Sequence, residues 1–175
     1  MEAEASQVIE RLYELFAAPR PRVVEFCNHC VDPADIAPFT AVALRELTAG
    51  QVEKYWLRSG TIGDEGFRRY LLPRVLELIA GGSLDADFFW LRLAVEAHAE
   101  GDSREQAVIQ DYFLAVPHAL AALVGDVVGS KDADGALATW LRGVEPLAVL
   151  EEAALGGPDP DGRISEAHMA LEVWR

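Results

Sequence analysis

Cysteine is scarce in this chain of 175 residues, which holds only two, at positions 27 and 30. Two cysteines are too few for the disulfide framework that stabilises small secreted domains. The N-terminal stretch MEAEASQVIERLYELF is acidic and amphipathic, so it does not read as a secretory signal. No stretch approaches the roughly 18 apolar residues that a membrane-spanning helix needs. We therefore expect a cytoplasmic protein that does not bind a membrane.

Positive charge is also scarce. The 15 lysines and arginines stand against 29 aspartates and glutamates, which gives a formal net charge of -14. Residues 1–90 carry 14 acids and 9 bases, and residues 91–175 carry 15 acids and 6 bases, so their net charges are -5 and -9. Such a field repels phosphate backbones, and we expect no nucleic-acid partner. It attracts a basic protein partner, although negative charge that only keeps the protein soluble explains the same composition.

The motifs of the common enzyme classes are missing as well. The sequence contains no G-x-S-x-G, no H-E-x-x-H, no Gly-rich phosphate loop and no G-x-G-x-x-G. Glu96 and His98 are two residues apart and therefore lie on different faces of a helix, which makes them a poor acid–base pair. These absences favour a protein without catalytic activity.

Apolar residues at helical spacing fill most of the chain. Val8, Leu12 and Phe16 lie on one stripe, and the stretch DADFFWLRLAVEAHAE is apolar nearly all round, as in a helix with neighbours on most sides. No stretch shows the alternation of a β-strand. The predicted fold is all-α and a single domain over residues 1–175. It is either an irregular helical bundle or a short HEAT-like α-solenoid, with about seven or eight helices.

The ends and breaks of these helices carry their own signals. A short helix is predicted around residues 40–47, after an irregular section that holds the cysteines. The predicted N-caps are Thr48, Asp85, Ser103 (in a capping box with Gln106) and Ser165. Proline inside a helical pattern predicts a kink or a split. This applies to Pro73 in the helix over 64–80 and to Pro117 in the helix over 103–124.

The loop Cys27-Asn28-His29-Cys30 is the first candidate site. A C-x-x-C pair supplies two thiolates that one zinc ion can bridge, and His29 and His98 are the candidates for further ligands. A second C-x-x-C, which would complete a structural zinc site, is missing from the sequence. A redox pair and two buried, reduced thiols that pack as small hydrophobes are the other interpretations. We expect no cofactor, with zinc bound by Cys27, His29, Cys30 and His98 as the alternative.

The stretch TIGDEGFRRYLLPRVLEL, residues 61–78, holds the second candidate site. Arg74 falls at the edge of its apolar face, beside Tyr70, where an unpaired guanidinium would be costly. Glu77, three residues on, is the local candidate partner, and Glu46 and Glu25 are distant ones. In a structural role Arg74 would tie this helix to the loop near residues 20–30. In a functional role Arg45, Tyr70 and Arg74 would bind an anion or a carboxylate.

Several short motifs occur together between residues 19 and 80. They are Pro-Arg-Pro at 19–21, Cys-Asn-His-Cys at 27–30, Leu-Arg-Glu-Leu at 44–47 and LPRVLEL at 72–78. This combination resembles an uncharacterised group of small bacterial helical proteins that pair a Cys-x-His-Cys loop with an LPR-x-LEL helix. The group has no known activity, so the resemblance implies no catalytic residue. It implies that Cys27, Cys30, Arg45 and Arg74 belong to one structural unit.

Three functions are compatible with these patterns. The first is a non-enzymatic protein-interaction protein, of the immunity-protein or adaptor type, whose acidic surface binds a basic protein partner. The second is a zinc-binding protein that uses the Cys27–Cys30 loop. The third, which rests on the fewest residues, is an all-α enzyme with a site around Arg74, Tyr70 and Arg45. The charge and the missing catalytic motifs favour the first.

Overall fold

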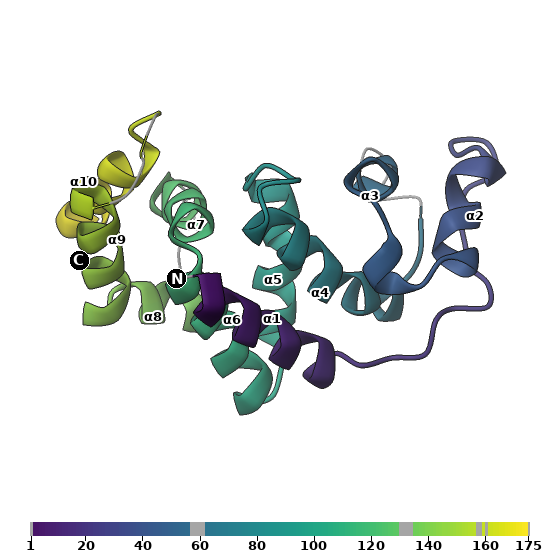
Figure 1. Cartoon of the computed structure of the whole chain (residues 1–175), viewed down its shortest axis with the longest axis horizontal. Coiled ribbons are helices and arrows are strands. Elements are labelled where there is room, and N and C mark those ends of the chain that lie inside the picture. The colour runs from purple at the N-terminus through teal and green to yellow at the C-terminus, as the bar shows by residue number, and fades with distance from the viewer. Residues whose placement is uncertain (1, 57–61, 130–134, 157–158, 160, 175) are drawn as a thin grey trace. The chain divides into compact units, whose positions relative to one another are not determined.

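The computed structural model describes residues 2–56, 62–129, 135–156, 159 and 161–174 of the chain. Within these residues it contains ten α-helices and one short 3₁₀-helix (Figure 1). It contains no β-strand there, and the only β-type pairing is an isolated antiparallel bridge between Phe26 and Ile62. The prediction of an all-α fold is confirmed. The number of helices is higher than predicted.

The chain forms two compact units. Unit 1 comprises Met1–Arg11 and Ala86–Arg175, and unit 2 comprises Leu12–Asp85. Helix α1, Glu2–Leu15, contributes residues to both units. Charge is divided very unevenly between them. Unit 1 has 19 acidic and 7 basic residues, a net charge of -12, whereas unit 2 has 10 acidic and 8 basic residues, a net charge of -2. A single domain over residues 1–175 stays a prediction.

Unit 2 is built around aromatic side chains from three helices. Its elements after α1 are α2 (Pro33–Ala41), the 3₁₀-helix η1 (Leu44–Glu46), α3 (Ala49–Trp56) and α4 (Glu65–Ala80). Phe39 of α2, Tyr55 of α3 and Phe67 of α4 meet edge to face, with ring centroids 5.4 to 6.2 Å apart. All three side chains are buried. Offset and edge-on ring pairs add to the stabilisation that burial of the same surface provides.

The prediction of a helix over residues 40–47 is wrong. Helix α2 begins earlier, at Pro33, because the carboxylate of Asp32 accepts a hydrogen bond from the backbone N–H of Ala34 at 2.8 Å. Proline is favoured at the start of a helix, where its missing N–H costs nothing. The chain then turns through η1 before α3. Thr48 is confirmed as a cap, since its hydroxyl oxygen accepts a hydrogen bond from the N–H of Gln51 at 3.3 Å. In the other direction, the side-chain oxygen of Gln51 accepts a hydrogen bond from the N–H of Thr48 at 2.9 Å.

Helix α4 is continuous from Glu65 to Ala80, so Pro73 does not split it, and the kink predicted as the alternative stays a prediction. The side chain of Asp64 caps this helix by accepting a hydrogen bond from the N–H of Phe67 at 2.8 Å. Pro73 itself is buried, and Leu72 and Val75 beside it are almost fully buried as well. Burial of this apolar face offsets the hydrogen bond that the proline removes.

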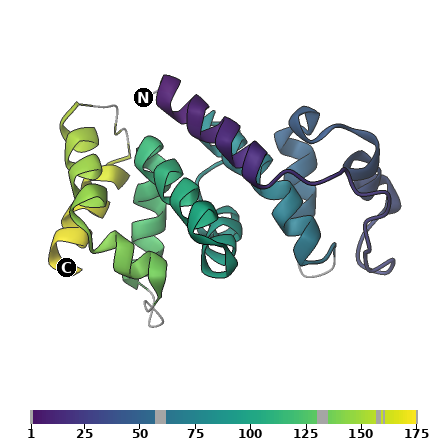
Figure 2. The same ribbon diagram turned by 90° about the horizontal axis from the view of Figure 1, so that it is seen from below.

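Unit 1 contains the remaining helices. They are α5 (Phe88–Glu100), α6 (Ser103–Ala115), α7 (Pro117–Gly129), α8 (Ala136–Leu141), α9 (Val144–Gly156) and α10 (Arg163–Trp174). Helix α5 packs against α6, α7 and α8, as its nearly all-round apolar sequence predicts. Helix α10 packs against α7 and α9 (Figure 1, Figure 2). The core residues between them include Leu91, Tyr112, Phe113, Leu120 and Leu171, each fully buried.

The helix predicted over residues 103–124 is two helices, α6 and α7, which meet at an angle of 108°. The bend predicted at Pro117 is confirmed, and Pro117 itself is the first residue of α7, where its missing N–H costs nothing. Among the described residues no single helix is long and apolar enough to cross a bilayer. The bent pair of α6 and α7 passes that test of length and composition only when both helices are taken together.

The N-caps predicted for three helices of unit 1 are wrong, and a different aspartate takes the place of each. Asp102, and not Ser103, caps α6: its carboxylate accepts from the N–H groups of Arg104 and Glu105 at 2.8 and 3.0 Å. The Glu105 side chain completes the capping box at 3.1 Å. Asp87, and not Asp85, caps α5 through the N–H of Trp90 at 3.1 Å.

The start of α10 is held by Asp159 in place of Ser165. The Asp159 carboxylate accepts hydrogen bonds from the N–H groups of Ile164 and Ser165 and from the Ser165 hydroxyl, at 3.1, 3.0 and 2.8 Å. Helix α10 begins at Arg163, so Ser165 is already inside it. An aspartate offers two acceptor oxygens and a charge that the helix N-terminus stabilises, which explains why it takes this place.

Candidate functional site

Arg74 is anchored on both sides in unit 2. Its Nε donates to the backbone carbonyl of Leu47 at 2.8 Å, and a terminal nitrogen donates to Oε2 of Glu77 at 2.6 Å. Only 15% of the Arg74 side chain is exposed. Glu77, three residues along the helix, is therefore the partner that the sequence predicted. The bond to Leu47 corrects the predicted structural role of Arg74. Arg74 ties α4 to the end of η1, whereas the sequence predicted that it ties α4 to the loop near residues 20–30.

Glu77 also binds two residues from other segments. The hydroxyl of Tyr13, in α1, donates to Oε2 of Glu77 at 2.6 Å. A guanidinium nitrogen of Arg45, in η1, lies 4.0 Å from Oε1, and the guanidinium carbon of Arg45 lies 3.7 Å from the centre of the Tyr13 ring. Burial and the hydrogen bond to Glu77 raise the pKa of Tyr13. One carboxylate thus holds α1, η1 and α4 together.

A cavity of about 520 Å³ opens beside this cluster. Arg45 and Tyr70, two of the three predicted anion-binding residues, both line it, together with Tyr13 and Arg20. Arg74 is not among the described residues that line the cavity. It contacts Glu77, which in turn contacts the lining residues Tyr13 and Arg45. Tyr13 and Arg20 were missed by the sequence analysis. Arg20 belongs to the Pro-Arg-Pro segment, which entered only as one of the motifs of the resemblance, and Tyr13 adjoins the apolar stripe of α1.

The two cysteines lie close together at the surface of unit 2. Their sulfur atoms are 3.5 Å apart, and the backbone N–H of Cys30 donates to the carbonyl of Cys27 at 2.9 Å. Neither cysteine forms a disulfide and both are exposed, so the interpretation as buried thiols is wrong. The backbone N–H of His29, followed by the Cys30 thiol, lowers the pKa of Cys27. This geometry favours a thiolate at Cys27.

His98, the fourth predicted metal ligand, is buried in unit 1. Its Nε2 lies 3.0 Å from the side-chain nitrogen of Gln110, and the side chain of Gln106 donates to its backbone carbonyl at 3.1 Å. Burial lowers the pKa of His98 and favours the neutral imidazole. In the part of the chain that the structure describes, no group of three or more His, Cys, Asp or Glu side chains could hold a metal ion. A zinc site stays a prediction.

Helices α9 and α10 expose apolar side chains. Among the described residues, four of the five large exposed hydrophobic side chains belong to these two helices: Val144, Leu155, Met169 and Val173. Leu155 is 84% exposed and Val173 is 90% exposed. The same helices carry five glutamates (145, 151, 152, 166 and 172) and one arginine, Arg163. Apolar and acidic groups are therefore combined on both.

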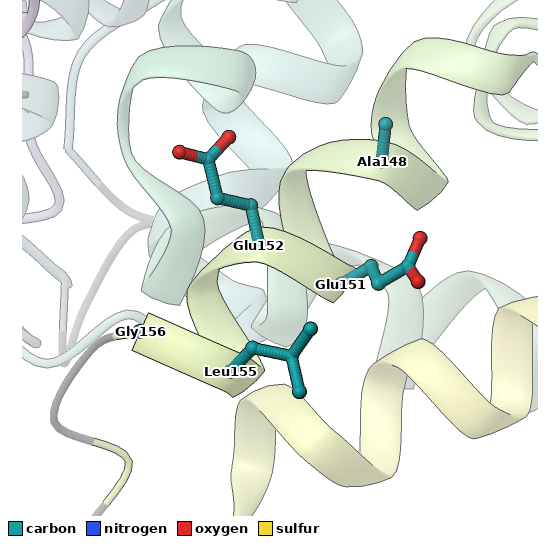
Figure 3. Close-up of a pocket in the computed structure, with 5 residues that line it drawn as sticks. All are labelled: Ala148, Glu151, Glu152, Leu155 and Gly156. Atoms are coloured by element: carbon teal, nitrogen blue, oxygen red, sulfur yellow. The ribbon is translucent and has the colours of Figure 1, made fainter.

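An open hollow of about 430 Å³ lies along α9, and its lining comes from that helix alone, between Ala148 and Gly156 (Figure 3). Figure 3 shows Glu151 and Leu155 extending to the same side of α9, while the carboxylate of Glu152 points the other way. The hollow is thus bordered by an apolar side chain and by two carboxylates. Its chemistry differs from that of the cavity in unit 2, whose charged groups are arginines.

Comparison with known proteins finds no matching family model, no matching curated protein and no matching solved structure. The resemblance to a group of small bacterial helical proteins stays a prediction. Cys27, Cys30, Arg45 and Arg74, which that resemblance assigns to one structural unit, all lie in unit 2.

Proposed function

We propose that this chain is a non-enzymatic protein-interaction protein that binds a basic segment of a partner protein through α9 and α10. The observation that carries the proposal is the exposure of large apolar side chains on two successive helices of the most acidic unit. Single exposed hydrophobic residues are ordinary on protein surfaces, but their concentration in one region is typical of interaction sites.

The exposed residues of α9 form a regular face. Val144, Ala148, Glu151 and Leu155 are all exposed, and their spacing of three or four residues puts them on one side of the helix from end to end. Opposite them Leu150 is fully buried in unit 1. Helix α9 contains no basic residue. Its exposed face therefore offers apolar contact together with negative charge.

A partner of complementary chemistry is a basic amphipathic segment. Its apolar residues would cover Leu155 and Val144, and its lysines or arginines would approach Glu151 and Glu152. The net charge of -12 on unit 1 would speed the encounter and select against acidic partners, while the apolar contacts would supply most of the affinity. Immunity proteins and adaptors act in this way.

The test is affinity capture with the immobilised full chain in an extract of the cells that produce it. We expect a basic protein to be retained at low salt and released at high salt, because salt screens exposed charges. The double variant Glu151→Lys, Glu152→Lys reverses the charge of the two exposed carboxylates that border the hollow along α9 and should reduce retention by about tenfold.

The matched control is the double variant Glu4→Lys, Glu100→Lys. It makes the same change in net charge at two exposed positions of unit 1, in α1 and α5. The control should keep the partner. If both double variants lose the partner equally, net charge and not the α9 face is responsible. If no basic protein is retained at low salt, the proposal loses its support.

The Cys27–Cys30 loop favours a second function, in which the chain binds zinc. Two thiolates of a tetrahedral zinc site lie about 3.8 Å apart, given zinc–sulfur bonds of about 2.3 Å, and the two sulfurs here are 3.5 Å apart and accessible. The test is elemental analysis of protein purified without a chelator or a polyhistidine tag. We expect Cys27→Ser and Cys30→Ser each to remove bound zinc. An unchanged metal content in both variants would exclude zinc binding by this loop.

A further inference from the structure

The cavity in unit 2 combines cationic groups with an apolar wall. Its charged lining residues are Arg20 and Arg45, and no aspartate or glutamate is among the described residues that line it. This is unusual in a chain whose acidic residues outnumber its basic ones by 29 to 15. The remaining polar groups are Tyr13 and Tyr70, and five apolar residues complete the wall: Phe16, Ala17, Ala18, Ala43 and Leu44.

Each of the two arginines has an anchoring contact beside the cavity. Arg20 follows α1, and one of its terminal nitrogens donates to the carbonyl of Ala41 at 2.9 Å. A guanidinium has five N–H donors in a fixed plane, so this bond orients the group without using it up. The guanidinium carbon of Arg45 lies over the ring of Tyr13, 3.7 Å from the ring centre.

Glu77 does not neutralise the cavity. Its Oε2 already accepts short hydrogen bonds from Arg74 and from Tyr13, at 2.6 Å each. Arg45 is the more distant partner, 4.0 Å from the other oxygen. Because the hydroxyl of Tyr13 is directed to Glu77, Tyr13 presents its ring to the cavity. Tyr70 is a further aromatic group, and it lines the same cavity as Arg20.

We propose that this cavity binds a small organic carboxylate. The carboxylate would accept hydrogen bonds from the guanidinium groups of Arg20 and Arg45, and the apolar body would lie against Phe16 and Leu44. Arginine suits this role because its planar pair of donors matches the two oxygens of a carboxylate. A volume of about 520 Å³ accommodates a molecule of the size of an amino acid or a small aromatic acid.

The apolar wall decides between classes of anion. Five of the nine lining residues offer only hydrocarbon, and a bare inorganic ion would leave that surface uncovered. A ligand with one charged end and one apolar end covers both parts of the wall. The inference is independent of the partner proposed for unit 1, because every lining residue belongs to unit 2.

The test is isothermal titration calorimetry of the full chain with 3-phenylpropionate as the probe. The neutral amide 3-phenylpropionamide and inorganic phosphate are the comparison ligands. We expect the carboxylate to bind at least about tenfold more tightly than the amide, since the amide cannot form charge-assisted hydrogen bonds. Equal binding of carboxylate and amide would overturn the proposal, as would tighter binding of phosphate.

Variants locate the binding. Arg20→Gln and Arg45→Gln should each weaken binding of 3-phenylpropionate by about tenfold, with the melting temperature of each variant measured to check folding. Arg22→Gln removes the same charge from an exposed position two residues from Arg20 and is the matched control. It should bind as the unaltered chain does. An equal loss in Arg20→Gln and Arg22→Gln would overturn the proposal.

Discussion

At the scale of single residues, Glu77 links three other side chains of unit 2. It joins Arg74 of its own helix to Tyr13 of α1 and to Arg45 of η1. Arg74 in turn satisfies the carbonyl of Leu47. Loss of Arg74 would leave a half-buried carboxylate and a backbone carbonyl with fewer partners, and such groups are costly when they lose their hydrogen bonds.

Replacement of Arg74 by methionine should therefore destabilise the chain. We expect Arg74→Met to lower the free energy of unfolding by about 2 kcal/mol, measured by chemical denaturation. The matched control is Arg104→Met. Arg104 pairs with Asp102 at 3.4 Å, but 77% of its side chain is exposed, so we expect a change of less than about 0.5 kcal/mol. Equal effects of the two variants would contradict this account of Arg74.

His98 gives unit 1 a dependence on pH. Burial lowers its pKa in the folded state below the ordinary value of 6.5. Above pH 6.5 the imidazole is neutral in both states, and its contribution to stability is fully present. As the pH falls through the lowered pKa that contribution is lost, because the unfolded state takes up the proton more readily.

Denaturation curves recorded between pH 8 and pH 5 test this dependence. The variant His98→Gln cannot take up a proton and should lose less stability over that range than the unaltered chain does. His118 is exposed, and His118→Gln is the matched control that should retain the full dependence. If His98→Gln and the unaltered chain respond equally to acid, burial of His98 is not the cause.

At the scale of elements, aspartates determine where three helices of unit 1 begin. Asp102 forms a complete capping box with Glu105, with one hydrogen bond in each direction between side chain and backbone. We expect Asp102→Ala to lower the free energy of unfolding by about 1 kcal/mol, measured by thermal denaturation. Ser103→Ala should change it by less than about 0.5 kcal/mol. If Ser103→Ala destabilised the chain more than Asp102→Ala does, Ser103 would be the cap after all.

The helices themselves were predictable from apolar spacing, but their ends were not. Each N-cap wrongly predicted for a helix of unit 1 lies one to six residues from the aspartate that takes its place. Several residues that can cap a helix stand close together in the sequence at these points, so the pattern alone does not select one of them. Helix α2 was missed because Pro33 and Pro38 read as a loop. In the structure Pro33 starts the helix, and Ile36 and Phe39 are buried around Pro38. That burial depends on tertiary neighbours that a local pattern does not contain.

The candidate sites show the same division between local and tertiary information. The Arg74–Glu77 pair was predictable because the two residues are three apart on one helix. Tyr13 and Arg20 meet Arg45 and Tyr70 at one cavity only through folding, and no spacing in the sequence brings them together. The exposure of the two cysteines was not predictable for a related reason, since free cysteine usually packs as a small buried hydrophobe and only the fold leaves these two at the surface.

At the scale of the whole molecule, the division of charge is the feature that the proposed function rests on. A division of the sequence at residue 90 gives net charges of -5 and -9, whereas the structural units carry -2 and -12. The difference in charge between the two units is larger than that between the two parts of the sequence, mainly because the acidic start of α1 belongs to unit 1. One unit is therefore suited to a basic partner, and the nearly neutral unit can sustain an anion-binding cavity.

Site-specific photo-cross-linking tests the central claim most directly. A benzoylphenylalanine is placed in turn at positions 148 and 155 on the exposed face of α9, and at position 107, an exposed position of α6, as the control. The account predicts that one basic protein is cross-linked from positions 148 and 155 and not from position 107, with a yield that falls as salt is added. An equal yield at all three positions, or an acidic protein cross-linked from α9, would contradict it.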